Sequence, residues 1–209
     1  DLEEKRALTY LKTWLLHHPD YQSATLTLQK QQIQEYEDMY GDSTSIGIDN
    51  HLHSQVTSMF LQAVKINPID QEIHEVLGVL YHLSNDYDKA IESFKIALQL
   101  NPNNASLWNK LGATQANSSR SKEAMYAYRR ALQLRPTYVR ALANLAISFA
   151  NQGMHQDAVR TYLATLKQNP KAQHIWSYLR ISLSHLDRRD LIPLLQKRDV
   201  TLFQPHFQF

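Results

Sequence analysis

Residues 102–136 read "PNNASLWNKLGATQANSSRSKEAMYAYRRALQLRP" and run from one proline to the next. The same spacing of 34 residues separates four successive prolines, which are Pro68, Pro102, Pro136 and Pro170. A proline ends a helix because it cannot continue the hydrogen-bond ladder. Four such ends at one fixed spacing indicate that the chain repeats a helical unit.

Other positions of the unit keep the same register. With proline at position 32, three full units are predicted at 71–104, 105–138 and 139–172. Position 8 is small (Gly78, Gly112, Ala146), position 20 is alanine (Ala90, Ala124, Ala158) and position 24 is aromatic (Phe94, Tyr128, Tyr162). A period of 34 residues is that of the tetratricopeptide repeat, a pair of antiparallel helices. A generic amphipathic bundle would not hold these positions in register over three periods.

The predicted fold is therefore all-α. We expect a right-handed superhelix of tetratricopeptide repeats, each a helix–turn–helix unit, closed by a C-terminal capping helix. The residues expected to be buried between helices are Trp108, Leu111, Gly112, Ala124 and Tyr128.

The flanking segments are predicted to be partial units. Residues 1–19 read as the second helix of a truncated repeat, and residues 51–70 read as a degenerate repeat helix. The polar stretch 20–50 between them is expected to be a linker or long connection. Residues 173–209 are expected to form C-terminal helices and a tail that caps the apolar end of the stack with Leu202, Phe203, Phe207 and Phe209. Since residue 1 precedes a second helix that lacks its partner, we expect the natural protein to extend further N-terminally.

Composition argues against several classes of function. The net charge is +2 and the basic residues are scattered, whereas a nucleic-acid surface needs a clustered basic stripe. There are no cysteines, and none of the 5 glycines lies in a phosphate-binding loop motif. The paired histidines of 17–18 and 51–53 have no third ligand at a suitable spacing for a metal. We find no nucleophile–base set either, so we expect no catalytic residue, no metal and no cofactor.

The inner face of the stack carries the candidate site. In such a superhelix the first helix of each unit lines the concave surface, with positions 2, 5, 6, 9, 12 and 13 pointing inward. The polar and small residues at these positions, which we predict to bind a peptide, are Asn109, Lys110, Ala113, Asn117, Arg140, Asn144 and Asn151.

These residue types suit an extended peptide. An asparagine amide offers two donors and an acceptor, so it can satisfy both the N–H and the C=O groups of a peptide. Lys110 and Arg140 suit a terminal carboxylate, and Ala113 leaves room for a backbone to approach. For Asn117 and Asn151 the alternative is that they are only helix C-caps, where asparagine is common.

At these residues the sequence resembles a known family, the peroxisomal import receptors that read the type-1, C-terminal targeting signal. The segments that carry the resemblance are "LGVLYHLSNDYDKA", "LWNKLGATQANS", "AYRRALQLRPTYVRALANLAISFANQG" and "IWSYLRISLS", within residues 52–186. The resemblance implies that the groove asparagines hold the backbone of a C-terminal tripeptide and that the Lys110–Arg140 pair attracts its carboxylate. It also implies that the partners are cargo targeting peptides and, through an N-terminal region absent from this sequence, docking proteins of the peroxisomal membrane. The implied location is cytoplasmic, with cycling to the peroxisomal or glycosomal membrane.

Two other functions stay open at this point. One is a chaperone adaptor that grips an acidic C-terminus with a carboxylate clamp. Such a clamp needs more cationic groove positions than Lys110 and Arg140, and Asn144 stands where another lysine or arginine is expected. The other is a non-catalytic repeat domain of an enzyme.

Overall fold

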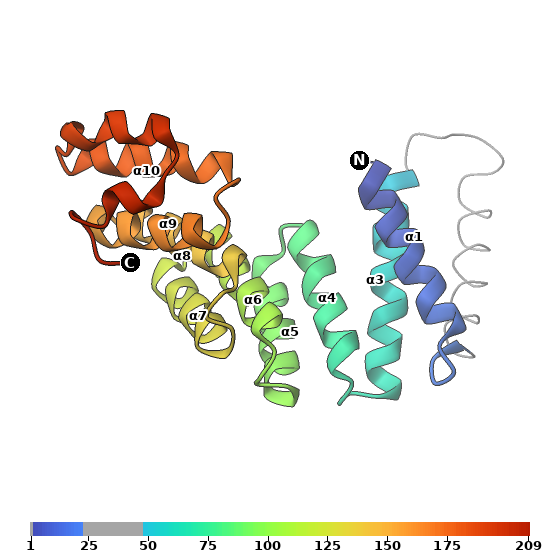
Figure 1. Cartoon of the computed structure of the whole chain (residues 1–209). Coiled ribbons are helices and arrows are strands. Elements are labelled where there is room, and N and C mark those ends of the chain that lie inside the picture. Colours follow the sequence, from blue (N-terminus) through green and yellow to red (C-terminus); the bar gives the residue numbers. More distant parts are fainter. Residues whose placement is uncertain (1, 23–47) are drawn as a thin grey trace. The chain divides into compact units, whose positions relative to one another are not determined.

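The computed structural model describes residues 2–22 and 48–209, and all regular secondary structure in these ranges is helical (Figure 1). The chain divides into two compact units, Asp1–Leu100 and Asn101–Phe209. The first contains α1 (Leu2–His17), α3 (Ile48–Ile66), α4 (Gln71–Leu83) and α5 (Tyr87–Leu100). The second contains α6 (Ala105–Asn117), α7 (Ser121–Leu134), α8 (Val139–Asn151), α9 (His155–Gln168), α10 (Gln173–His185) and the 3₁₀ helices η1 (Arg189–Lys197) and η2 (Val200–Phe203). Most of the predicted connection 20–50 lies outside the described residues, and its last three residues belong to α3.

In the first unit α1 packs on α3, α3 on α4, and α4 on α5 (Figure 1). Tyr21 is fully buried, and its hydroxyl donates a hydrogen bond to Oδ2 of Asp70 at 2.5 Å. The other oxygen of Asp70 accepts the backbone N–H groups of Glu72 and Ile73, which satisfies two of the donors that the start of α4 leaves unpaired. One carboxylate thus caps α4 and fixes the chain that follows α1.

In the second unit each helix packs on the next, from α6 to α10. The side chains of α7, α8, α9 and α10 that face inward form one apolar cluster, which includes Tyr128, Leu145, Tyr162, Leu163 and Leu179. The all-helical tetratricopeptide-repeat prediction is therefore confirmed.

The small residue at position 8 makes room for the aromatic residue at position 24 of the same repeat. A Cβ atom on Gly112 would lie 2.6 Å from the ring of Tyr128, and one on Gly78 would lie 2.5 Å from the ring of Phe94. Both rings are almost completely buried. The two helices of these repeats can pack this closely only because a glycine stands at the contact.

The turn between the two helices of a unit also repeats. Its central residue is in the left-handed conformation in four successive units, at Asn85 (φ 60°), Ser119 (φ 63°), Gly153 (φ 72°) and Asp187 (φ 56°). These positions lie 34 residues apart. Glycine, asparagine and aspartate adopt this conformation more readily than other residues do, so Ser119 is the member of the series that suits it least.

Position 4 contributes a regular hydrogen bond that the sequence analysis did not anticipate. The indole N–H of Trp108 donates to the carbonyl of Pro102 at 2.8 Å, and that of Trp176 donates to the carbonyl of Pro170 at 3.2 Å. Trp176 is buried, but Trp108 is only half-buried, so the prediction that Trp108 is buried is wrong. The Trp108 ring instead lies at the surface of its helix pair, beside Tyr126 and Arg130.

The predicted C-terminal capping helix is replaced by two 3₁₀ helices. Pro193 lies inside η1, and in an α-helix its ring would clash with the carbonyl of the residue four positions earlier. Phe203 and Phe207 are nevertheless buried in the apolar cluster of the second unit, and Leu202 and Phe209 pack against it. The apolar end is covered as expected, but by shorter elements.

Candidate peptide-binding site

The candidate site lies within the second unit, where α6 and α8 contact each other. These are the first helices of two successive repeats. Asn109 on α6 is 4% exposed, and Asn144 on α8 is half-buried. Nδ2 of Asn144 donates a hydrogen bond to Oδ1 of Asn109 at 3.2 Å. The structure therefore joins two of the seven predicted residues directly, across neighbouring repeats.

This hydrogen bond leaves part of each amide available. Among the described residues, Nδ2 of Asn109 and Oδ1 of Asn144 have no hydrogen-bond partner. One amide thus presents donors and the other an acceptor. The N–H and C=O groups of an extended peptide require this combination.

The two predicted cationic residues differ in exposure. Lys110 is half-buried in the middle of α6, and its backbone carbonyl accepts the hydroxyl of Thr114 at 3.0 Å. Arg140 is exposed in the first turn of α8, and within residues 2–22 and 48–209 it forms no ion pair. An exposed guanidinium of this kind attracts an anion mainly through a field that salt screens.

Asn117 and Asn151 are the last residues of α6 and α8, and both are exposed. Ser118 and Gln152 follow them as the C-cap residues, and the left-handed positions belong to Ser119 and Gly153. Neither asparagine therefore takes the left-handed conformation that makes asparagine a common cap. Their participation in a peptide site remains a prediction.

Ala143 and Ile147 of α8 were not among the predicted site residues. The predicted Ala113 is half-buried on α6, and Ile147 is its equivalent one repeat later, 34 positions on. Ile147 and Ala143 of α8 are partly buried and pack against the apolar cluster of the unit. The signal was the repeat register itself, which places Ile147 at position 9 beside Asn144 at position 6.

Metal-binding clusters and membrane-spanning helices are two further features that the described ranges can be checked for. No group of three or more His, Asp or Glu side chains there could hold a metal ion. None of the helices in those ranges has the length and apolar character needed to span a membrane.

Comparison with known proteins agrees with this architecture. A model described as TPR repeat matches residues 80–119, and one described as tetratricopeptide repeat matches residues 118–180. Peroxisome biogenesis protein 5 of Arabidopsis thaliana is 44% identical over 95 residues, which are 46% of this chain and 11% of that protein. The peroxisomal targeting signal receptor of Yarrowia lipolytica is 43% identical over 47 residues, 21% of this chain and 8% of that protein. These repeats are homologous to those of peroxisomal targeting signal receptors.

The peroxisomal targeting signal 1 receptor of Dictyostelium discoideum is similar too, with 42% identity over 45 residues, 21% of this chain and 7% of that protein. The matched segments thus span only a small part of each of these receptors. Among solved structures, MamA superimposes with a TM-score of 0.68 at 21% identity, covering 75% of this chain and 93% of the other. YrrB, described as a TPR protein with an unusual peptide-binding site, gives a TM-score of 0.63 at 18% identity, covering 84% and 93%. At such identities these two structures support the fold alone.

Proposed function

We propose that this chain is the cargo-binding part of a cytosolic, non-catalytic import receptor. It recognises the C-terminal Ser-Lys-Leu-type tripeptides of peroxisomal or glycosomal matrix proteins. The observation that carries the proposal is the Asn109–Asn144 amide pair, which bridges the first helices of two repeats homologous to those of targeting signal receptors. Signals of this type are addresses that a receptor reads, and they do not insert into the membrane.

In this mechanism the peptide lies extended along α6 and α8. The Oδ1 atom of Asn144 accepts a peptide N–H group, and Nδ2 of Asn109 donates to a peptide carbonyl. Lys110 and Arg140 supply positive potential at the terminal carboxylate.

The same peptide meets apolar and polar surface beyond the amide pair. The apolar side chain of the last residue contacts Ala113 and Ile147. Asn117 and Asn151 extend the row of amides along the peptide. The loaded receptor then cycles to the organelle membrane, where docking proteins receive it.

The test is a binding titration of the 209-residue chain with a fluorescent peptide that ends in Ser-Lys-Leu. The free acid should bind more tightly than the same peptide with an amidated C-terminus, because only the acid carries the charge that Lys110 and Arg140 attract. Asn144→Ala should weaken binding of the free acid by about one to two decades, since it leaves polar groups of both Asn109 and the peptide unpaired.

Asn103→Ala is the matched control. Asn103 is an exposed residue of the turn before α6, so Asn103→Ala removes an equivalent side-chain amide that lies outside the candidate site. It should leave affinity unchanged. Equal affinity for the acid and the amidated peptide, or for Asn144→Ala and the unmodified chain, would refute the proposed mode of recognition.

A further inference from the structure

The last helix of the array departs from the repeat rule at position 8. Where the three full repeats carry glycine or alanine, α10 carries Arg180. In the repeat of Gly112 the aromatic ring of the second helix fills the space above position 8. Arg180 is exposed, and position 24 of this segment is Gln196 instead of an aromatic residue, so no ring fills that space. The partner of α10 must therefore pack differently.

α10 packs against η1, but the two elements are in contact over only part of their length. Leu191 of η1 is 2% exposed and belongs to the apolar cluster. Farther along η1, an open hollow of about 720 Å³ separates the two elements. Gln196, at position 24 in the repeat register, is one of the residues that line it.

The hollow has an apolar floor and a cationic rim. Trp176 from α10 and Ile192 and Leu195 from η1 line the floor. Arg180 and Arg198 line the same hollow from opposite elements, and both are exposed. No residue that lines it is acidic.

The two arginines also differ from their neighbours in pairing. Arg188 pairs with Asp190 at 2.9 Å, and Arg189 pairs with Asp187 at 3.6 Å. In the described part of the chain, neither Arg180 nor Arg198 has an acidic partner. Their positive charges are therefore available to a ligand.

We propose that this hollow binds an acidic peptide segment in which an apolar side chain neighbours a carboxylate. The apolar side chain packs on Trp176 and Leu195, and Arg180 and Arg198 take the carboxylate. Guanidinium and carboxylate form paired, charge-assisted hydrogen bonds, which give this contact its direction. The site is separate from the Asn109–Asn144 pair and does not depend on the function proposed for that pair.

The experiment follows the indole N–H signal of Trp176 in an NMR titration of the full 209-residue chain. The probe is acetyl-Gly-Phe-Glu-Glu-Phe-Gly-amide, which has no terminal carboxylate and so cannot use the recognition proposed for α6 and α8. We expect the Trp176 signal to shift and to saturate. The matched peptide with Gln-Gln in place of Glu-Glu should bind about tenfold more weakly, because it lacks the charge that the arginines require.

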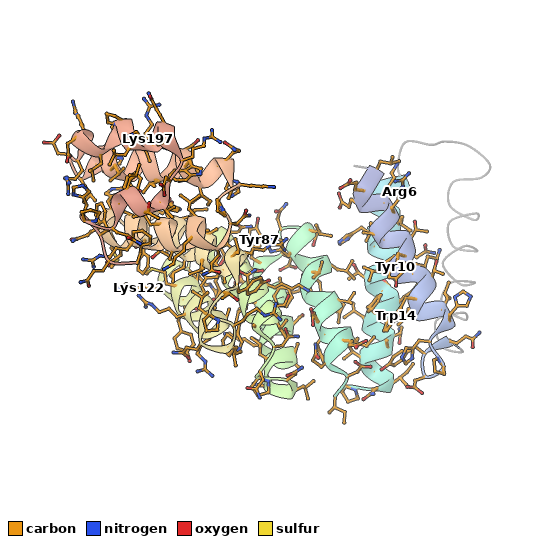
Figure 2. All side chains as sticks on the ribbon, viewed as in Figure 1. Arg6, Tyr10, Trp14, Tyr87, Lys122 and Lys197 are labelled. Atoms are coloured by element: carbon orange, nitrogen blue, oxygen red, sulfur yellow. The ribbon has the colours of Figure 1, made fainter. Side chains whose placement is uncertain are left out.

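Three variants complete the test. Arg180→Gln and Arg198→Asn should each weaken binding of the acidic probe about tenfold, and asparagine tolerates the left-handed backbone of residue 198 (φ 50°). Lys197→Gln is the matched control, because Lys197, labelled in Figure 2, is exposed and precedes Arg198 in the sequence. It is not among the residues that line the hollow. Circular dichroism checks that each variant is folded.

The proposal is overturned if the Trp176 signal does not move at millimolar probe. It is equally overturned if the Glu-Glu and Gln-Gln peptides bind alike, or if Lys197→Gln weakens binding as much as Arg180→Gln does. A probe that is lost with Asn144→Ala and kept with Arg180→Gln would place the acidic segment on α6 and α8 instead.

Discussion

Substituting Gly112 by alanine tests the packing rule on which the repeat depends. In the interior of a helix this change normally stabilises, by about 1 kcal/mol, because alanine loses less backbone entropy than glycine. Here the added methyl group meets the ring of Tyr128 at 2.6, 2.8 and 3.1 Å from three of its carbon atoms. That ring is 2% exposed and belongs to the apolar cluster, so it has no free space into which to move.

The two effects have opposite signs, and the steric effect should win. Overpacking a well-filled core costs about 1–3 kcal/mol, and three close ring contacts place this case in the upper part of that range. After the gain in helix propensity, Gly112→Ala should lower the free energy of unfolding by about 1–2 kcal/mol. For a chain of this size the melting temperature should then fall by about 2–8 °C, as followed by circular dichroism at 222 nm.

A double-mutant cycle separates the two effects. In a Tyr128→Leu background the ring is gone, so Gly112→Ala should stabilise by up to about 1 kcal/mol. The reverse change at the equivalent position, Ala146→Gly, is the matched control and should destabilise by about 1 kcal/mol without relieving any clash. The reasoning is wrong if Gly112→Ala raises the melting temperature of the unmodified chain, or if its effect is the same with and without the Tyr128 ring.

Four further substitutions test the turn, the site and the acid sensitivity of the second unit. Ser119→Asn should stabilise, and Gly153→Ala should destabilise, by about 1 kcal/mol each in thermal melts. Both positions are left-handed, a conformation that asparagine adopts more readily than serine and glycine more readily than alanine. No change in melting temperature for either variant would contradict the strain argument. Arg140→Gln should weaken binding of a free-acid Ser-Lys-Leu peptide at low salt and have no effect at about 1 M salt, whereas an effect independent of salt would indicate direct contact instead. Burial, and to a smaller extent the charge of the stacked His185 ring, lowers the pKa of His155 from its ordinary value of 6.5. The unfolded chain therefore binds more protons below that pH, stability falls as the pH drops, and His155→Gln should reduce this acid-induced loss in melts between pH 7 and pH 5.

The repeating parts of the fold could be predicted from the sequence. Proline, small and aromatic residues that recur together at one spacing do not arise from composition alone. The prolines, the small position 8 and the aromatic position 24 together predicted which helices pair and which faces they bury. The left-handed turn could be predicted from the same 34-residue spacing, since Asn85, Gly153 and Asp187 are of the types that favour that conformation.

The details that failed depend on single contacts, which the repeat register does not determine. Trp108 was expected to be buried because it stands at position 4, on the helix face that packs inward. Trp176 at the same position makes the same hydrogen bond and is buried, whereas the ring of Trp108 lies beside Tyr126 and Arg130 and stays half-buried. In the site, the register placed Asn109 and Asn144 on equivalent faces of α6 and α8. It did not predict that the amides would bond to each other, because that depends on how closely the two helices approach.

At the C-terminal end of the repeats, the residue at position 8 affects whether a further helix can pack in the usual way. A small residue at position 8 admits the ring of a second helix, and each helix pair then offers an apolar face to the next pair. On α10 position 8 is Arg180 and position 24 is Gln196, so that contact is absent, and Pro193 prevents η1 from forming an ordinary α-helix. The apolar cluster still has to be covered, and Phe203 of η2 and Phe207 just beyond it do so from a segment shorter than a full helix. The hollow between α10 and η1 is the space that remains, and Arg180 at position 8 supplies one side of its cationic rim.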